Sequence, residues 1–145
     1  MNRDTSFHCI VIADDGEEEG ERAASVALNL AASMKSSVVL LGVVEPASIQ
    51  AEGEGLAVRD PSEVRRRLQE RYERLLALGH DLELKMSMEM REGEAGEQIN
   101  AVAKRENADL VVVGRRHLSR FSRMLRGSTS DDVIRGAPCS VLVVK

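Results

Sequence analysis

Aromatic residues are scarce in this sequence, and their scarcity argues against a nucleic-acid partner. Among 145 residues the aromatic side chains are only Phe7, Tyr72 and Phe121, too few for the stacking surface on which single-strand binders place bases. The formal net charge is -4, so the chain as a whole does not attract a polyanion. We therefore expect no nucleic-acid partner.

Cysteine and histidine are also few, which argues against a metal centre. Cys9 and Cys139 are just two and each stands beside an apolar or small residue, a setting typical of buried thiols rather than of a disulfide. His8, His80 and His117 are scattered and match no zinc-ligand spacing. The sequence thus predicts no metal site.

Long apolar runs are absent as well. No run approaches the ~20 residues that a membrane-spanning helix needs, and the first residues, MNRDTSF, lack the charged-then-apolar layout of a signal peptide. We expect a cytoplasmic protein without a membrane partner. A length of 145 residues fits a single domain, 1–145.

What the sequence does contain is a regular alternation of apolar runs and amphipathic segments. Strands alternating with helices are typical of a parallel sheet covered on both faces. We predict an α/β fold, a three-layer sandwich with a five-stranded parallel sheet in the order 3-2-1-4-5 and helices on both faces. The predicted strands are residues 9–13, 38–44, 82–91, 109–114 and 140–144, with helical periodicity between them.

Two of these strands are expected at the sheet edges. The third run alternates strictly from Leu82 to Met90, which is typical of a strand with one solvent-exposed face. The last run, Ser140–Val144, would be the other edge, yet it has no polar alternation and no charge before Lys145. We therefore predict that a second copy covers it, giving a homodimer through Ser140–Val144.

The composition changes between the second strand and the second helix. Residues 46–60 are rich in Gly, Ala and Glu without periodicity, which predicts a flexible connector. The DPSE stretch at Asp60–Glu63 predicts a helix start, with Asp as the N-cap and Pro in the first turn. Gly79 is predicted to end this helix, and the Arg65–Arg67 run is interpreted as a solvated face rather than a polyanion site.

A basic segment follows the fourth strand. In VVVGRRHLSRFSRMLRGSTSDD, residues 111–132, five arginines and one histidine lie between Gly114 and Gly127. Glycines permit tight turns, and the free N–H groups of the next helix would form an anion site. Arg115 and Arg116 would add bidentate contacts to a phosphate. The alternative is that the loop is merely long and basic, with its arginines in water.

The residues around this loop resemble the universal stress protein family, and the resemblance covers essentially the whole chain. The family's nucleotide motif runs Gly, two residues, Gly, nine residues, then Gly and Ser or Thr. Here the frame is Gly114-Arg115-Arg116-His117, nine residues, then Gly127-Ser128-Thr129. The ending VIRGAPCSVLVV is also family-like, as is the segment from Glu92 to Asp109.

The resemblance implies an adenine nucleotide, typically ATP, with or without Mg²⁺. Asp15 would hold the ribose, with Ala13 two residues earlier, and the backbone of Val43 would contact the adenine. The family also dimerises through its last strand. The phosphates would contact Gly114, Gly127, Ser128 and Thr129, next to Arg115, Arg116 and His117.

His117 departs from the family motif, in which this position is the second glycine. Left-handed geometry costs a histidine roughly 1–2 kcal/mol, and about 1.4 kcal/mol weakens binding tenfold; a charged imidazole would instead contact the phosphate. Two functions therefore stay open. One is a stress-response or regulatory module that binds ATP, and the other is a dimeric interaction module of the same fold without a nucleotide.

Catalysis is not expected beyond slow ATP hydrolysis. No nucleophile is paired with a base, and only Asp14 or Asp15 would position Mg²⁺ or water. The stretch IVIADD also resembles the first strand of response-regulator receivers. A receiver needs an aspartate at the end of its central strand to accept a phosphoryl group. The third strand offers none, and DLVVVG has glycine at that position, so this function is disfavoured.

Overall fold

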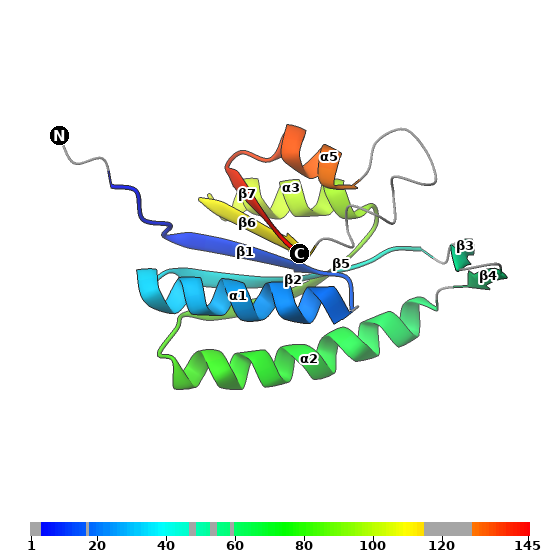
Figure 1. Cartoon of the computed structure of the whole chain (residues 1–145), viewed down its shortest axis with the longest axis horizontal. Coiled ribbons are helices and arrows are strands. Elements are labelled where there is room, and N and C mark those ends of the chain that lie inside the picture. Colours follow the sequence, from blue (N-terminus) through cyan, green and yellow to red (C-terminus); the bar gives the residue numbers. More distant parts are fainter. Residues whose placement is uncertain (1–3, 17, 47–48, 53–54, 59, 115–128) are drawn as a thin grey trace.

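The computed structural model describes residues 4–16, 18–46, 49–52, 55–58, 60–114 and 129–145. Within them strands and helices alternate along the chain (Figure 1), except that three strands follow one another between the first two helices. In chain order the elements are β1 (Cys9–Asp14), α1 (Glu18–Met34), β2 (Ser37–Val44), β3 (Ile49–Glu52), β4 (Gly55–Val58), α2 (Pro61–Asp81), β5 (Met86–Glu92), α3 (Ala95–Arg105), β6 (Leu110–Gly114), α5 (Thr129–Gly136) and β7 (Ser140–Val144).

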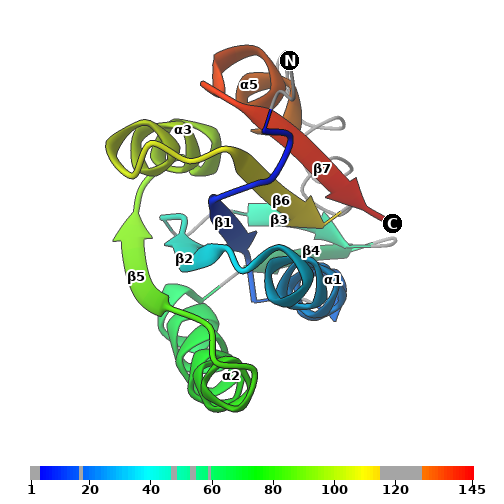
Figure 2. The same cartoon turned by 90° about the vertical axis from the view of Figure 1, so that its left-hand side faces the viewer.

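Five of the strands form one parallel sheet in the order β5-β2-β1-β6-β7. Numbered among themselves, these strands follow the order 3-2-1-4-5, which confirms the prediction. Figure 2 shows α1 and α2 on one face of the sheet and α3 and α5 on the other. The chain moves outward from β1 through β2 to β5, and then from β6 to β7 on the other side. The direction of winding therefore reverses between β1 and β6.

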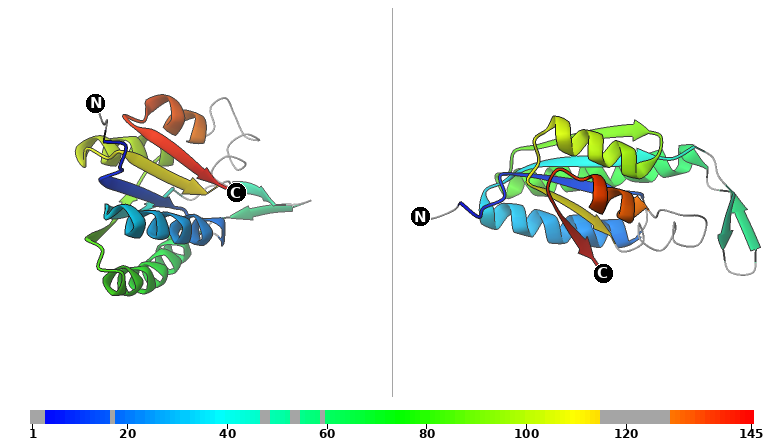
Figure 3. Two further views of the ribbon diagram at one scale, coloured as in Figure 1. Left: turned by 60° about the vertical axis from the view of Figure 1, so that its left-hand side comes forward. Right: turned by 90° about the horizontal axis from the view of Figure 1, so that it is seen from above.

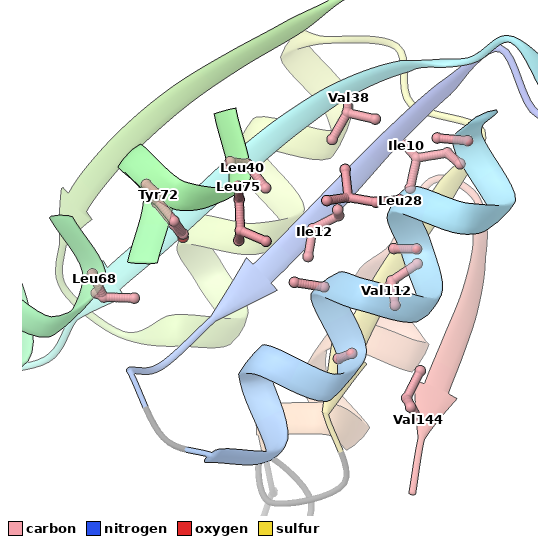
Figure 4. Close-up of a cluster of buried hydrophobic side chains, with 14 of the residues drawn as sticks. Ile10, Ile12, Leu28, Val38, Leu40, Leu68, Tyr72, Leu75, Val112 and Val144 are labelled. Carbon is pink, nitrogen blue, oxygen red and sulfur yellow. The ribbon is translucent and has the colours of Figure 1, made fainter. Parts of the chain in front are cut away.

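Side chains along the central strands alternate between the two faces, as the pleat requires. On the face covered by α1 and α2, strand side chains such as Ile10, Ile12, Val38 and Leu40 pack with the helix side chains Leu28, Leu68, Tyr72 and Leu75 in one buried cluster (Figure 4). On the other face, Val11, Ala13, Val39, Leu41 and Val43 pack with Ile99, Val102 and Ala103 of α3 in a second cluster. The apolar runs are thus buried on both sides, as expected for central parallel strands.

The second helix begins as predicted but does not end at Gly79. The Asp60 side chain accepts a hydrogen bond from the Ser62 N–H at 2.9 Å, and proline occupies the first turn. Gly79 lies inside α2, where a Cβ would overlap the Met86 side chain. The glycine therefore allows α2 to approach β5 closely. The left-handed residue after the helix is Glu83, with φ of 58°.

Because α2 is longer than predicted, β5 is shorter. It begins at Met86 instead of residue 82, and Leu82 becomes the C-cap of α2. β5 does lie at the sheet edge, as its alternation predicted, and Met88 is 40% exposed. At the opposite edge, β7 has the predicted bounds.

The stretch predicted as a connector, 46–60, contains an antiparallel hairpin that was not expected from the sequence. β3 and β4 are paired along their whole length: Ile49 lies opposite Val58 at one end, and Glu52 lies opposite Gly55 at the other. Figure 3 shows this hairpin standing away from the main sheet. Its sequence is dominated by Gly, Ala and Glu, which are depleted in strands, so composition did not predict the pairing.

Two smaller expectations concern the thiols and the membrane. Cys9 and Cys139 are free thiols, each partly buried. None of the helices in the described ranges combines the length and apolarity needed to cross a membrane.

Candidate functional site

The candidate site lies at the carboxyl end of β1, where the winding of the sheet reverses. In open parallel sheets ligands bind beyond the strand ends at this point. The β1–β2 ladder ends with the pair Asp14–Gly42, whereas the β2–β5 ladder continues to Val44–Glu92. β2 therefore runs two residues past its pairing with β1, and on the other side β6 ends at Gly114, level with Asp14.

Four of the predicted ligand residues meet at this point. Ala13 is fully buried in β1, Asp15 follows that strand at 5% exposure, and Val43 in β2 is 4% exposed. Ala13 pairs with Val113, next to Gly114. Alanine and glycine at adjoining strand ends present little side-chain bulk, which fits the close approach of a ligand to the backbone.

The other predicted ligand residues follow β6 in the sequence. Thr129 begins α5, so a helix starts after the basic segment of the sequence, as predicted. The remaining residues lie outside the described part of the chain: Arg115, Arg116, His117, Gly127 and Ser128.

The sequence leaves Asp14 and Asp15 as alternatives for positioning Mg²⁺ or water, but in the structure Asp14 is committed to a buried ion pair. It continues the face of β1 that carries Ile10 and Ile12, toward α1 and α2. Its Oδ1 accepts a hydrogen bond from Nη1 of Arg71 at 2.6 Å and another from the Gly16 N–H at 2.9 Å. Side-chain exposure is 0% for Asp14 and 8% for Arg71. Asp14 is therefore turned into the protein rather than toward an open metal position.

The ion pair lies among other buried polar groups. Burial raises the pKa of the Asp14 carboxyl, and the Arg71 guanidinium beside it opposes that rise. Burial also raises the pKa of the Tyr72 hydroxyl well above its ordinary value. Three buried atoms of this cluster have no hydrogen-bond partner among the described residues: Asp14 Oδ2, Arg71 Nε and the Tyr72 hydroxyl oxygen.

The sequence carries a signal for this ion pair, although the pair was not predicted. The apolar stripe of α2 includes Leu68 and Leu75, and Arg71 lies between them at the helical spacing of three and four residues. Asp14 likewise follows Ile10 and Ile12 at the strand spacing of two. Opposite charges at inward positions of two adjoining elements indicate a buried pair.

The arginine run at the start of α2, Arg65–Arg67, forms a solvated face as predicted. Arg65 pairs with Glu92, Arg66 with Glu63 and Glu70, and Arg67 with Glu63. The arginine side chains of these pairs are 43%, 56% and 48% exposed. Exposed pairs of this kind form a solvated face and leave little charge for a polyanion.

A second helix N-terminus near the site is occupied by the protein itself. Glu45 follows β2, and its Oε1 accepts a hydrogen bond from the Ala95 N–H, the first residue of α3, at 3.4 Å. A carboxylate is favoured there by the partial positive charge of the helix start. The start of α3 is therefore less available to a ligand phosphate than the start of α5, which the basic segment precedes in the sequence.

The whole chain can be compared with known proteins. A model of the universal stress protein family matches residues 6–145. The chain belongs to the universal stress protein family. A universal stress protein of Methanocaldococcus jannaschii is 30% identical over 147 residues, which cover 99% of this chain and 85% of that protein. Family membership confirms the resemblance seen in the sequence.

Solved structures share the fold. A universal stress protein in complex with cAMP aligns with a TM-score of 0.72 at 22% identity, over 97% of this chain and 98% of the other. A universal stress protein from Archaeoglobus fulgidus in complex with dAMP aligns with a TM-score of 0.64 at 21% identity, over 95% of this chain and 98% of the other. These structures therefore share the α/β architecture with this chain.

Proposed function

We propose that this chain is a cytoplasmic stress-response or regulatory module, a single domain that binds ATP at the carboxyl ends of β1, β2 and β6 and acts as a homodimer. The observation that carries the proposal is the position of Asp15. A buried carboxylate follows β1 at the reversal point of the sheet. The complexes of two universal stress proteins with cAMP and dAMP support an adenine nucleotide as the ligand class.

Each part of the nucleotide has a proposed contact. Asp15 holds the ribose, and the backbone of Val43, beyond the last β1–β2 pair, contacts the adenine. Gly114 lets the chain turn toward the phosphates. The residues that would hold the phosphates are Gly127, Ser128 and Thr129, with Arg115, Arg116 and His117 beside them.

The proposed dimer uses the edge of β7. Among the described strands β7 pairs only with β6, and its middle residues, Val141, Leu142 and Val143, are partly exposed. An apolar edge strand without charges is a template for pairing with another chain. Sedimentation equilibrium should give twice the mass of one chain, and a monomer at micromolar concentration would contradict this part of the proposal.

The nucleotide is tested first with the purified protein. After denaturation, any released nucleotide is identified by chromatography. In parallel, ATP with Mg²⁺ at 100 times its dissociation constant should stabilise the fold by ~2.7 kcal/mol, seen as a rise in melting temperature. Asp15→Ala should abolish most of this rise. No released nucleotide and no rise with millimolar ATP would argue against nucleotide binding.

The alternative is a dimeric interaction module without a nucleotide, and it is favoured by His117 in place of the second motif glycine. His117→Gly separates the two functions. If His117 weakens binding through its left-handed backbone, the glycine variant should bind ATP about tenfold more tightly. If the imidazole contacts a phosphate, the variant should bind less tightly. A variant that binds no ATP at all would favour the interaction module.

A further inference from the structure

We propose that Arg71 is a positioning residue which, through Asp14, fixes the β1–α1 turn and thereby the ribose contact of Asp15. This inference rests on the proposed function of Asp15. Arg71 comes from α2, 57 residues after Asp14 in the chain, and has no assigned contact with the ligand.

The contacts of Arg71 lie on both sides of Asp15. Its Nη1 donates to Asp14 Oδ1 at 2.6 Å, and its Nη2 donates to the Gly16 carbonyl oxygen at 3.4 Å. The Gly16 N–H donates to the same Asp14 oxygen at 2.9 Å, and Gly16 has a φ of 84°. One guanidinium therefore holds the residue before Asp15 and the residue after it.

Two glycines provide the room for this arrangement. A Cβ on Gly20 would overlap Asp14 Oδ1 and lie 3.1 Å from Arg71 Nη1. A Cβ on Gly42, the register partner of Asp14, would lie 3.2 Å from the Tyr72 hydroxyl oxygen. Strand β2, at Gly42, and helix α1, at Gly20, thus both lack a side chain where the polar cluster lies.

Burial distinguishes Arg71 from its neighbours on α2. Arg74, one turn further along, pairs with Glu21 at 3.3 Å, and their side chains are 63% and 51% exposed. The Arg71 side chain is only 8% exposed. A buried charged pair often stabilises a fold no better than apolar residues would, and the role that we propose for this one is to fix the local geometry.

The polar atoms that lack partners support the same conclusion. Asp14 Oδ2, Arg71 Nε and the Tyr72 hydroxyl oxygen have none among the described residues, and buried groups in this condition are unfavourable. The partners that the cluster does have are on each side of Asp15: the Asp14 carboxylate before it, and the N–H and carbonyl oxygen of Gly16 after it.

The experiment compares the binding of ATP with that of 2′,3′-dideoxy-ATP, which lacks both ribose hydroxyls. The main variant is Asp14→Asn/Arg71→Met, because removing both charges avoids leaving one of them buried alone. We expect its preference for ATP over the dideoxy analogue to fall roughly tenfold, the loss of one charge-assisted contact. Its affinity for the analogue should stay within about twofold of that of the wild type.

A second readout does not depend on nucleotide. Amide hydrogen exchange at Gly16 should become roughly tenfold faster in the double variant, while exchange in α3 stays unchanged. Arg71→Lys keeps the charge but lacks the forked guanidinium, so we expect the same loss of preference. Arg74→Met is the matched control and should alter neither readout.

Three other outcomes are informative. Unchanged preference and unchanged Gly16 exchange in the double variant would overturn it, and an equal loss for both nucleotides would show a general structural role. If the wild type binds neither nucleotide, the proposed function fails and the ribose role with it. Exchange at Gly16 then still decides whether Arg71 holds the turn.

Discussion

On the face of the sheet covered by α1 and α2, an ion pair lies inside the apolar core, whereas on the α3 side the pairs lie at the surface. Asp14 and Arg71 have side chains 0% and 8% exposed. Glu89 of the edge strand β5 and Arg105 of α3 are 29% and 47% exposed. Both pairs join a strand to a helix, so burial is the main difference between them.

The difference in burial changes what each pair contributes. A surface pair gains little because water already solvates both charges. In a buried pair, each charge depends on its partner, and removing one leaves the other without solvent or counter-charge. We therefore expect mutation of the buried Asp14–Arg71 pair to lower the stability of the fold strongly, and mutation of the surface Glu89–Arg105 pair to lower it only slightly.

The largest effect is expected from Arg71→Met. Leaving Asp14 buried without its partner should lower the free energy of unfolding by about 3–5 kcal/mol. Urea unfolding measures this, with Arg74→Met as the control on the same helix, which should cost about 0.5 kcal/mol or less. Equal losses in the two variants would remove the contrast between buried and surface arginines.

A smaller but still large effect is expected from Gly20→Ala. Alanine in a helix is normally favoured over glycine by roughly 1 kcal/mol, so this change would ordinarily stabilise α1. Here the added methyl group would overlap Asp14 Oδ1, and we expect a net loss of about 1–3 kcal/mol. Thermal unfolding distinguishes the two signs, and a rise in melting temperature would mean that the ion pair has room to move.

The smallest effect is expected from Glu89→Gln at the surface pair. The hydrogen bond from Arg105 holds the pKa of Glu89 below its ordinary value of 4.5. The ionised carboxylate therefore stabilises the fold above that pH, and the contribution is lost as the pH falls below it. At neutral pH the variant should be less stable than the wild type by about 1 kcal/mol or less.

The difference in stability between the wild type and Glu89→Gln should shrink toward zero when urea unfolding is repeated at progressively lower pH, below 4.5. Glu73→Gln is the matched control, because Glu73 is exposed and forms no ion pair within the described residues. A difference for Glu89→Gln that stays constant with pH would indicate that packing, and not charge, is responsible.

The strand order was predictable because burial leaves a pattern in each strand. β1, β2 and β6 are apolar on both faces and lie at the centre, whereas β5 alternates and lies at an edge. Gly79 was misinterpreted because glycine serves two purposes, a left-handed backbone and close packing. The sequence around it does not show which one applies, since the Met86 contact comes from another element.

The candidate site was predictable only in part. The family resemblance assigned Asp15 to the ribose, and the predicted strand order brings the end of β1, which Asp15 follows, beside the end of β6. Arg71 was missed because an arginine among other arginines on an amphipathic helix is usually solvated. Its position on the apolar stripe becomes informative only together with Asp14, and these residues are far apart in the sequence.

The parallel arrangement of β1, β6 and β7 has a mechanical consequence. β1 starts at one end of the parallel sheet and β7 finishes at the opposite end of the sheet, with β6 hydrogen-bonded between them (Figure 1). Tension applied between these two points loads both ladders along their length, so their evenly spaced bonds share the force and must rupture together. Tension applied across the sheet, from β5 to β7, would instead open one bond after another.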